Sequence, residues 1–120
     1  MLIDKGKEWI ENWKANHQAI ADLFQQRRYP EAKEPVQYYT KQLVLVLGWL
    51  NDTELIVDNT LSEKLTQLTY APFNSQERIP FILRQPEQYY CYIQLNELYK
   101  ETEKIYAKVA ILKQKTRSQQ

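Results

Sequence analysis

The sequence predicts an all-α fold: a helical bundle of four principal helices and one short helix, forming a single domain over residues 1–120. Two observations predict it. Apolar residues return every three or four positions along most of the chain, which is the repeat of one face of a helix. Only two glycines occur, whereas antiparallel sheets usually need several for tight hairpin turns. We therefore expect helices joined by proline-bearing loops.

The first helix is predicted from about residue 7 to residue 28. Its apolar face, at steps of three and four residues, carries Ile10, Trp13, His17, Ile20 and Phe24. Pro30 and Pro35 then bracket a polar turn. Pro35 suits the first position of a second helix, where its missing N–H has no partner to lose.

The second helix is predicted from Pro35 to Leu50. Its buried face is expected to carry Val36, Tyr39, Leu43, Val46 and Leu50. Within the apolar run at residues 43–50, the first five residues alternate leucine and valine, a composition that also suits a buried strand. The helical repeat continues into this run without a break, and few turn signals elsewhere provide partner strands. We therefore expect a central apolar helix that stops at Asn51 and Asp52.

A third helix is predicted at residues 60–70. Thr60 and Glu63 have the spacing of a capping box, in which each side chain accepts a hydrogen bond from the other residue's backbone N–H. The buried edge of this helix is expected to carry Leu61, Leu65 and Leu68.

The short helix is predicted at residues 75–84. Asn74 and Glu77 repeat the capping-box spacing and should open it. Pro80 lies inside it and lacks the N–H that a helix interior uses. We therefore expect this helix to be kinked or confined to one or two turns.

The last helix is predicted from Pro86 to about residue 115. Its apolar stripe, at alternating steps of four and three, carries Cys91, Leu95, Leu98, Thr102, Ile105, Val109 and Leu112. At 1.5 Å per residue the helix is about 45 Å long, against about 30 Å for the diameter of a small domain. We expect its end to project, with the basic tail at residues 113–120 frayed.

Charge is distributed unevenly along the chain. The net charge is +1, but residues 104–120 contain five basic side chains and no acidic one. The remainder holds 11 basic and 15 acidic side chains, a charge of −4. A basic helix end complements the helix dipole, and it can also bind the phosphates of a nucleic acid.

The sequence predicts no catalytic site, no metal site and no cofactor. His17 and Cys91 are the one candidate base and nucleophile, and ordinary packing is favoured for both because each lies on an apolar face. Gly6 and Gly48 are too far apart for a phosphate-binding loop, and the spacings of zinc ligands are absent. Glu97 is interpreted, with Glu101 and the lysines that follow them, as part of a solvated helix face.

Cysteine usage and hydropathy indicate the compartment. Cys91 is the only cysteine, which rules out an intramolecular disulfide and favours a reducing cytoplasm. The N-terminal residues lack the pattern of a secretory signal. The longest apolar run, residues 43–50, is shorter than the roughly 20 residues of a membrane span. We therefore expect a cytoplasmic protein with no membrane role.

Several motifs between residues 71 and 115 resemble those of the YpoC-like family. They are the Glu77–Arg78 pair, the apolar run at 81–83, the IQLNEL run at 93–98 and the EKIYAK run at 103–108. The resemblance implies a small cytoplasmic bacterial protein, in a family of unknown function whose genes tend to lie near those for DNA repair and replication initiation. It assigns no functional residues.

We expect a non-enzymatic interaction or accessory protein with a protein partner, and the alternative is a nucleic-acid-binding protein acting through the basic C-terminal helix. An exposed apolar patch would favour a protein partner or a homodimer. The candidate interaction surface has two parts. The proline-rich corner and the start of the last helix contribute Asn74, Arg78, Arg84, Gln88 and Tyr90; the basic tail contributes Lys104, Lys108, Lys115 and Arg117.

Overall fold

The computed structural model describes the backbone of residues 2–118 and the side chains of residues 5–113. It contains the five helices α1 (Leu2–Gln25), α2 (Tyr29–Leu50), α3 (Leu61–Thr66), α4 (Ser75–Arg84) and α5 (Tyr89–Ser118). No strand occurs within the described backbone. The all-α prediction is confirmed, although the short helix is α3 rather than the one at residues 75–84.

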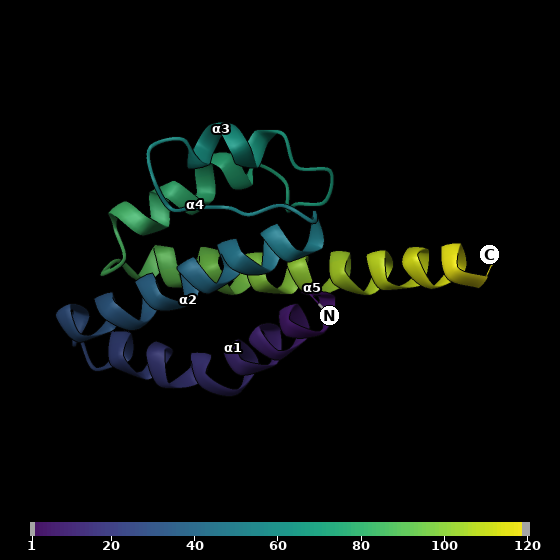
Figure 1. Ribbon diagram of the computed structural model, residues 1–120. Coiled ribbons are helices and arrows are strands. Elements are labelled where there is room, and N and C mark those ends of the chain that lie inside the picture. The colour runs from purple at the N-terminus through teal and green to yellow at the C-terminus, as the bar shows by residue number, and fades with distance from the viewer. Residues whose placement is uncertain (1, 119–120) are drawn as a thin grey trace.

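Helix α5 packs against α1, α2 and α4. Helices α1 and α2 form an antiparallel hairpin, α4 packs against both α2 and α5, and α3 packs on α4 (Figure 1). The molecule measures 54 × 30 × 20 Å along its principal axes. Its long dimension is that of α5, whose last turns extend past the other helices (Figure 1). None of the helices in the described part of the chain combines the length and the apolar character of a membrane span.

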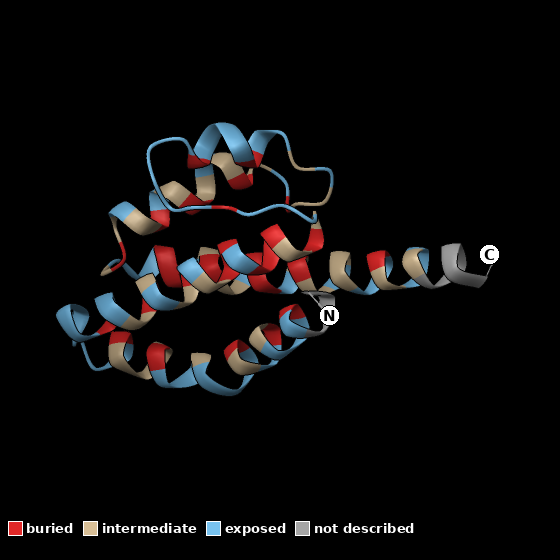
Figure 2. Cartoon of the chain, in the orientation of Figure 1, coloured by how far each residue is buried: buried red, intermediate tan, exposed pale blue. Residues whose placement is uncertain are grey.

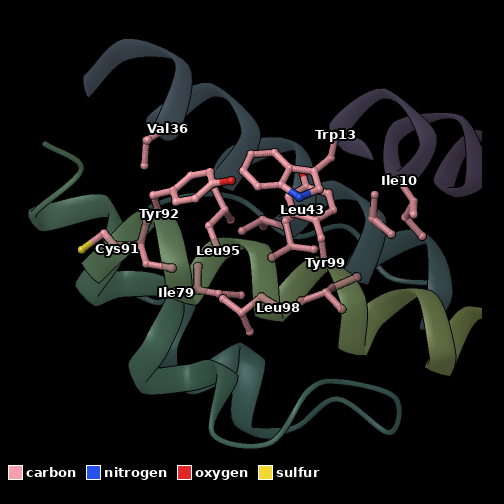
Figure 3. Packing of buried hydrophobic residues seen from close by; sticks show 14 of the residues in the cluster. Ile10, Trp13, Val36, Leu43, Ile79, Cys91, Tyr92, Leu95, Leu98 and Tyr99 are labelled. Carbon is pink, nitrogen blue, oxygen red and sulfur yellow. The ribbon is translucent and has the colours of Figure 1, made fainter. Parts of the chain in front are cut away.

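Aromatic side chains join α1, α2 and α5 in the core. The Trp13 indole stacks on the Tyr99 ring, with centroids 4.7 Å apart and planes 6° from parallel (Figure 3). Trp13 Nε1 donates to Asn96 Oδ1 at 3.0 Å, and the Tyr99 hydroxyl donates to the Tyr39 carbonyl. These bonds satisfy polar atoms that burial would otherwise leave without partners. Most of the buried residues lie where the helices face one another, and exposed residues lie on their outer sides (Figure 2).

The turn between α1 and α2 is shorter than predicted. Arg27 has a left-handed backbone with φ of 60°, and the Arg28 N–H donates to the Leu23 carbonyl at 2.8 Å. This bond closes α1 in the way that usually uses glycine, so the sequence carried no signal for it. The predicted turn between Pro30 and Pro35 is therefore wrong, because α2 begins at Tyr29 and Pro35 lies inside it.

Neither predicted capping box forms. The Thr60 N–H and hydroxyl both donate to Asp58 Oδ1, at 2.8 and 2.6 Å, so Asp58 takes the place that Glu63 was expected to fill. Asn74 has φ of 59° and makes no side-chain cap bond. Its Nδ2 donates to Glu77 Oε2 at 3.2 Å instead. Side-chain spacing alone therefore predicted where the two helices begin, but not what caps them.

Pro80 leaves α4 intact because another residue takes the bond that its nitrogen cannot make. In a regular helix the Gln76 carbonyl would accept from the residue at position 80. Here it accepts from the Ser62 hydroxyl at 2.8 Å. Helix α4 accordingly continues for 10 residues to Arg84, longer than the one or two turns predicted.

Helix α5 begins at Tyr89 rather than at Pro86. The Gln88 carbonyl accepts the first backbone hydrogen bond of the helix, from the Cys91 N–H at 2.9 Å. Its buried stripe ends at Val109, and the prediction that Leu112 is buried is wrong, since that side chain is exposed. The backbone is helical as far as Ser118. Fraying of residues 113–120 stays a prediction, because all of that segment beyond Lys113 lies outside the described side chains.

Candidate interaction surface

Arg78 is at the centre of a polar cluster between α4 and α5. Its Nη1 and Nη2 donate to Glu101 Oε1 and Oε2, at 3.0 and 2.7 Å. Its Nε donates to Gln94 Oε1 at 3.0 Å, and its Nη1 also donates to the Phe73 carbonyl at 2.9 Å. The ion pair is partly shielded, with the side chain of Arg78 18% exposed and that of Glu101 35% exposed. One side chain therefore joins α4, α5 and the loop before α4.

An open hollow of about 280 Å³ lies at this cluster and is called the Arg78 hollow below. Its lining residues are Asn74, Glu77, Arg78, Phe81, Tyr90 and Gln94. Phe81 and Tyr90 pack edge to face, with ring centroids 6.1 Å apart, and both are exposed. The side chain of Phe73, which precedes a lining residue, is 87% exposed. Three aromatic side chains thus reach solvent beside a polar hollow.

The backbone around Phe73 is held in place although its ring is exposed. Pro72 is buried, and its carbonyl accepts from the Ser75 N–H at 3.2 Å. Arg78 holds the carbonyl of Phe73 itself. An aromatic ring presented from a fixed backbone suits binding, because less conformational entropy is lost when a partner covers it.

The Arg78 guanidinium is poorly placed to bind a small anion. Four of the five N–H groups of Arg78 already donate within the chain, so its guanidinium is not placed for a two-point contact with a phosphate. Exposed aromatic rings beside a satisfied arginine are typical of the centre of protein interfaces.

Residues 4–114 match the profile of the family described as YpoC-like protein. The chain belongs to the YpoC-like protein family. The match extends the resemblance at residues 71–115 over nearly the whole chain and includes every residue that lines the Arg78 hollow. No curated protein and no solved structure matches this member of the family.

The structure brings three of the predicted site residues of this YpoC-like protein together. Asn74, Arg78 and Tyr90 all line the Arg78 hollow. Arg84 is exposed in the last turn of α4, and Gln88 precedes α5, where its Nε2 donates to Gln85 Oε1 at 3.0 Å. Neither of these two lines the hollow.

The basic part of the predicted surface lies farther along α5. Lys104 and Lys108 are exposed, and neither forms an ion pair within the described side chains. Lys115 and Arg117 lie outside the residues whose side chains are described. The predicted surface is therefore not continuous: three residues line the Arg78 hollow, Arg84 and Gln88 lie outside it, and Lys104 and Lys108 form a separate basic stretch.

Sequence reasoning missed five contributors to the hollow and its cluster: Phe73, Glu77, Phe81, Gln94 and Glu101. Glu101 was assigned to a solvated face, but it is the ion-pair partner of Arg78 across two helices. Gln94 and Glu101 are seven residues apart and so share one side of α5. The sequence features that could have indicated this surface are that spacing and the aromatic residue between Pro72 and Asn74.

His17 and Cys91 are both engaged in packing. His17 Nδ1 lies 2.8 Å from the Tyr92 hydroxyl, with which it shares a hydrogen bond, and its ring stacks on Trp13. The Cys91 sulfur points away from the Tyr92 ring (Figure 3). Burial raises the pKa of the Cys91 thiol to about 11, which is the opposite of what activates a nucleophile. Within the described residues, no three His, Cys, Asp or Glu side chains are grouped to hold a metal ion.

Proposed function

We propose that this protein is a non-enzymatic interaction protein that binds a protein partner through the Arg78 hollow and its aromatic rim. The observation that carries the proposal is the exposed aromatic group beside the hollow: Phe73 at 87% exposed, Tyr90 at 59% and Phe81 at 38%. Large aromatic side chains left in water are a feature of binding surfaces, because covering them releases a large apolar area.

The polar cluster supports this proposal by fixing the geometry of the rim. Arg78 ties the loop that carries Phe73 to α5, which carries Tyr90. The rim residues therefore keep their spacing before any partner arrives, which lowers the entropy cost of binding. Because Cys91 is the only cysteine and is a free, buried thiol, we propose that this binding takes place in the cytoplasm.

The proposal is tested by affinity purification of the tagged full chain from its own cells, comparing the wild type with the Phe73→Ala and Tyr90→Ala double variant. We expect a protein that the wild type captures to be lost from the double variant. The matched control is Tyr29→Ala, which removes an exposed aromatic ring that does not line the Arg78 hollow. Capture of the same proteins by all three chains would contradict the proposal.

A second candidate function is nucleic-acid binding through the basic end of α5. The observation that favours it is that Lys104 and Lys108 are exposed and unpaired among the described side chains. Five phosphate contacts would give a slope of about −4.5 in log affinity against log salt for duplex DNA. Gel shifts at low salt test it, with glutamine replacing Lys104, Lys108, Lys113, Lys115 and Arg117. A shift that these replacements leave unchanged would contradict it.

A further inference from the structure

A second hollow lies at the end of α2, far from the Arg78 hollow in sequence and lined by none of the same residues. Its volume is about 430 Å³, and its lining residues are Leu45, Gly48, Trp49, Asp52, Thr53, Glu54 and Leu55. We call it the Trp49 groove. Leu45, Gly48 and Trp49 are spaced as one face of a helix, so the groove runs along one side of the last turns of α2. Asp52 and the residues after it, which follow the end of the helix, close the groove.

The groove combines apolar walls with acidic side chains. Leu45 is exposed and Trp49 is half-buried, which leaves apolar surface open to solvent. Asp52 forms an ion pair with Lys113, with 3.3 Å between Oδ2 and Nζ. Glu54 forms no ion pair within the described residues. Two further exposed acids follow, Asp58 in the loop after the groove and Glu63 in α3. An occupant of this groove should therefore be basic and apolar together.

The outer face of the α5 end has that character. Lys113 points toward the body of its own chain, where it meets Asp52. Ile111 is two residues away, hence on the opposite side of the helix, and its side chain is 56% exposed. Lys104 and Lys108, seven and three residues before Ile111, share its side of the helix. Two lysines and an isoleucine thus form a stripe that faces away from the bundle.

These two surfaces complement each other but cannot meet within one chain, because the stripe lies on the side of α5 opposite Lys113, the residue that contacts Asp52 of the groove. They do lie close together, since the Lys113–Asp52 contact joins them, and Figure 1 shows the end of α2 beside the point at which α5 leaves the bundle. When complementary surfaces are neighbours on one molecule, a two-fold axis satisfies both at once and leaves no open end for further growth.

We propose that the protein forms a two-fold dimer in which the Lys104–Lys108–Ile111 stripe of each copy lies in the Trp49 groove of the other. Ile111 covers the apolar wall formed by Leu45 and Trp49, and Lys108 pairs with Glu54 across the interface. Both contacts occur twice because of the symmetry. The dimer also covers the Ile111 side chain, which is exposed in a single copy.

Sedimentation equilibrium of the full chain tests the dimer. We expect the wild type to reach twice its mass of 14.4 kDa as concentration rises, with weaker association at higher salt. Lys108→Glu and Glu54→Lys should each raise the dimer dissociation constant by about tenfold or more, because each places like charges together twice. The double variant that carries both changes should return close to the wild-type constant, since it rebuilds the pairs with exchanged signs.

Two further variants separate this interface from general effects. Ile111→Ser should weaken the dimer while keeping its salt dependence, because it removes only the apolar contact. Lys33→Glu, an exposed reversal near the start of α2, is the control and should change nothing. A wild type that stays monomeric at the highest concentrations, or single reversals that leave the dissociation constant unchanged, would overturn the proposal. These outcomes leave the Arg78 hollow untouched, because its residues are not altered.

Discussion

The Arg78 guanidinium and the Glu101 carboxylate face each other across α4 and α5 in a two-point contact, with nitrogen–oxygen distances of 3.0 and 2.7 Å. The same guanidinium holds the Phe73 carbonyl and the Gln94 side chain. A pair that is bidentate and partly shielded from water contributes more than an exposed pair, whose median contribution is about 0–1 kcal/mol. Arg78 is therefore expected to stabilise both the fold and the surface that it organises.

Arg78→Met should lower the free energy of unfolding by about 2–3 kcal/mol, because it strands the Glu101 carboxylate and the Phe73 carbonyl without their donor. Arg78→Lys should recover only part of this loss, because an ammonium group cannot make two parallel bonds to one carboxylate. Urea denaturation followed by circular dichroism measures both.

The control for that experiment is Arg28→Met. Arg28 pairs with Glu31, but both side chains are about half exposed, at 49% and 55%. Water competes for such a pair, so its loss should change stability little. Equal destabilisation by Arg28→Met and Arg78→Met would contradict the claim that the Arg78 ion pair stabilises the fold more than an exposed pair does.

The Ser62–Gln76 bond should matter only because Pro80 is present. Ser62→Ala leaves the Gln76 carbonyl without its donor and should cost about 1 kcal/mol of stability. In a Pro80→Ala background, the restored N–H at position 80 can serve that carbonyl, so the same substitution should cost less. A double-mutant cycle by urea denaturation measures the coupling, and additive effects would count against it.

Gly48→Ala should destabilise the fold, whereas Gly6→Ala should be close to neutral. A Cβ at position 48 would lie 2.7 Å from the Thr53 carbonyl oxygen, a backbone atom that cannot move alone. The clash should outweigh the gain of about 1 kcal/mol that alanine brings to a helix interior. At position 6 the nearest atom is in the Tyr106 ring, at 3.1 Å, and a side chain can shift. Thermal unfolding of both variants decides this, and a stabilising Gly48→Ala would contradict the close approach.

Cys91 should react slowly with alkylating reagents in the folded protein until the solution is strongly alkaline. Burial, and to a lesser degree the Glu87 carboxylate, raises the pKa of this thiol from 9.0 to about 11. Because the folded pKa is the higher one, the stability linked to this group is fully present below pH 9 and is lost as pH rises through 11. The rate of iodoacetamide modification against pH tests this, with the urea-unfolded chain as control. A folded midpoint at or below that of the unfolded chain would refute it.

The helical repeat predicted the fold because burial of one face determines where a helix lies. Trp13, Leu43 and Leu95 were expected on apolar faces and are buried. The bounds were less well predicted, since they depend on local bonds that spacing does not reveal. Arg27 adopts a left-handed backbone conformation that glycine usually adopts. Ser62 donates a hydrogen bond to the Gln76 carbonyl of α4, the helix that Pro80 was expected to shorten.

The candidate surface was predicted only in part for a related reason. Asn74, Arg78 and Tyr90 were identified from their residue types at one corner of the chain. The assignment of Glu101 to a solvated face was wrong. The charge spacing within α5 is compatible both with solvent and with an ion-pair partner on another helix, and the sequence alone does not place α4 against α5. The exposure of Phe73 likewise depends on how the loop before α4 is folded.

Site-specific photocrosslinking in living cells tests the central claim, that the rim of the Arg78 hollow meets a protein partner. A photoreactive phenylalanine analogue would replace Phe73 in one chain and Tyr29 in another. We predict a discrete crosslinked protein species from position 73 that is absent from position 29. No crosslinked species at position 73, or the same species from both positions, would contradict the account.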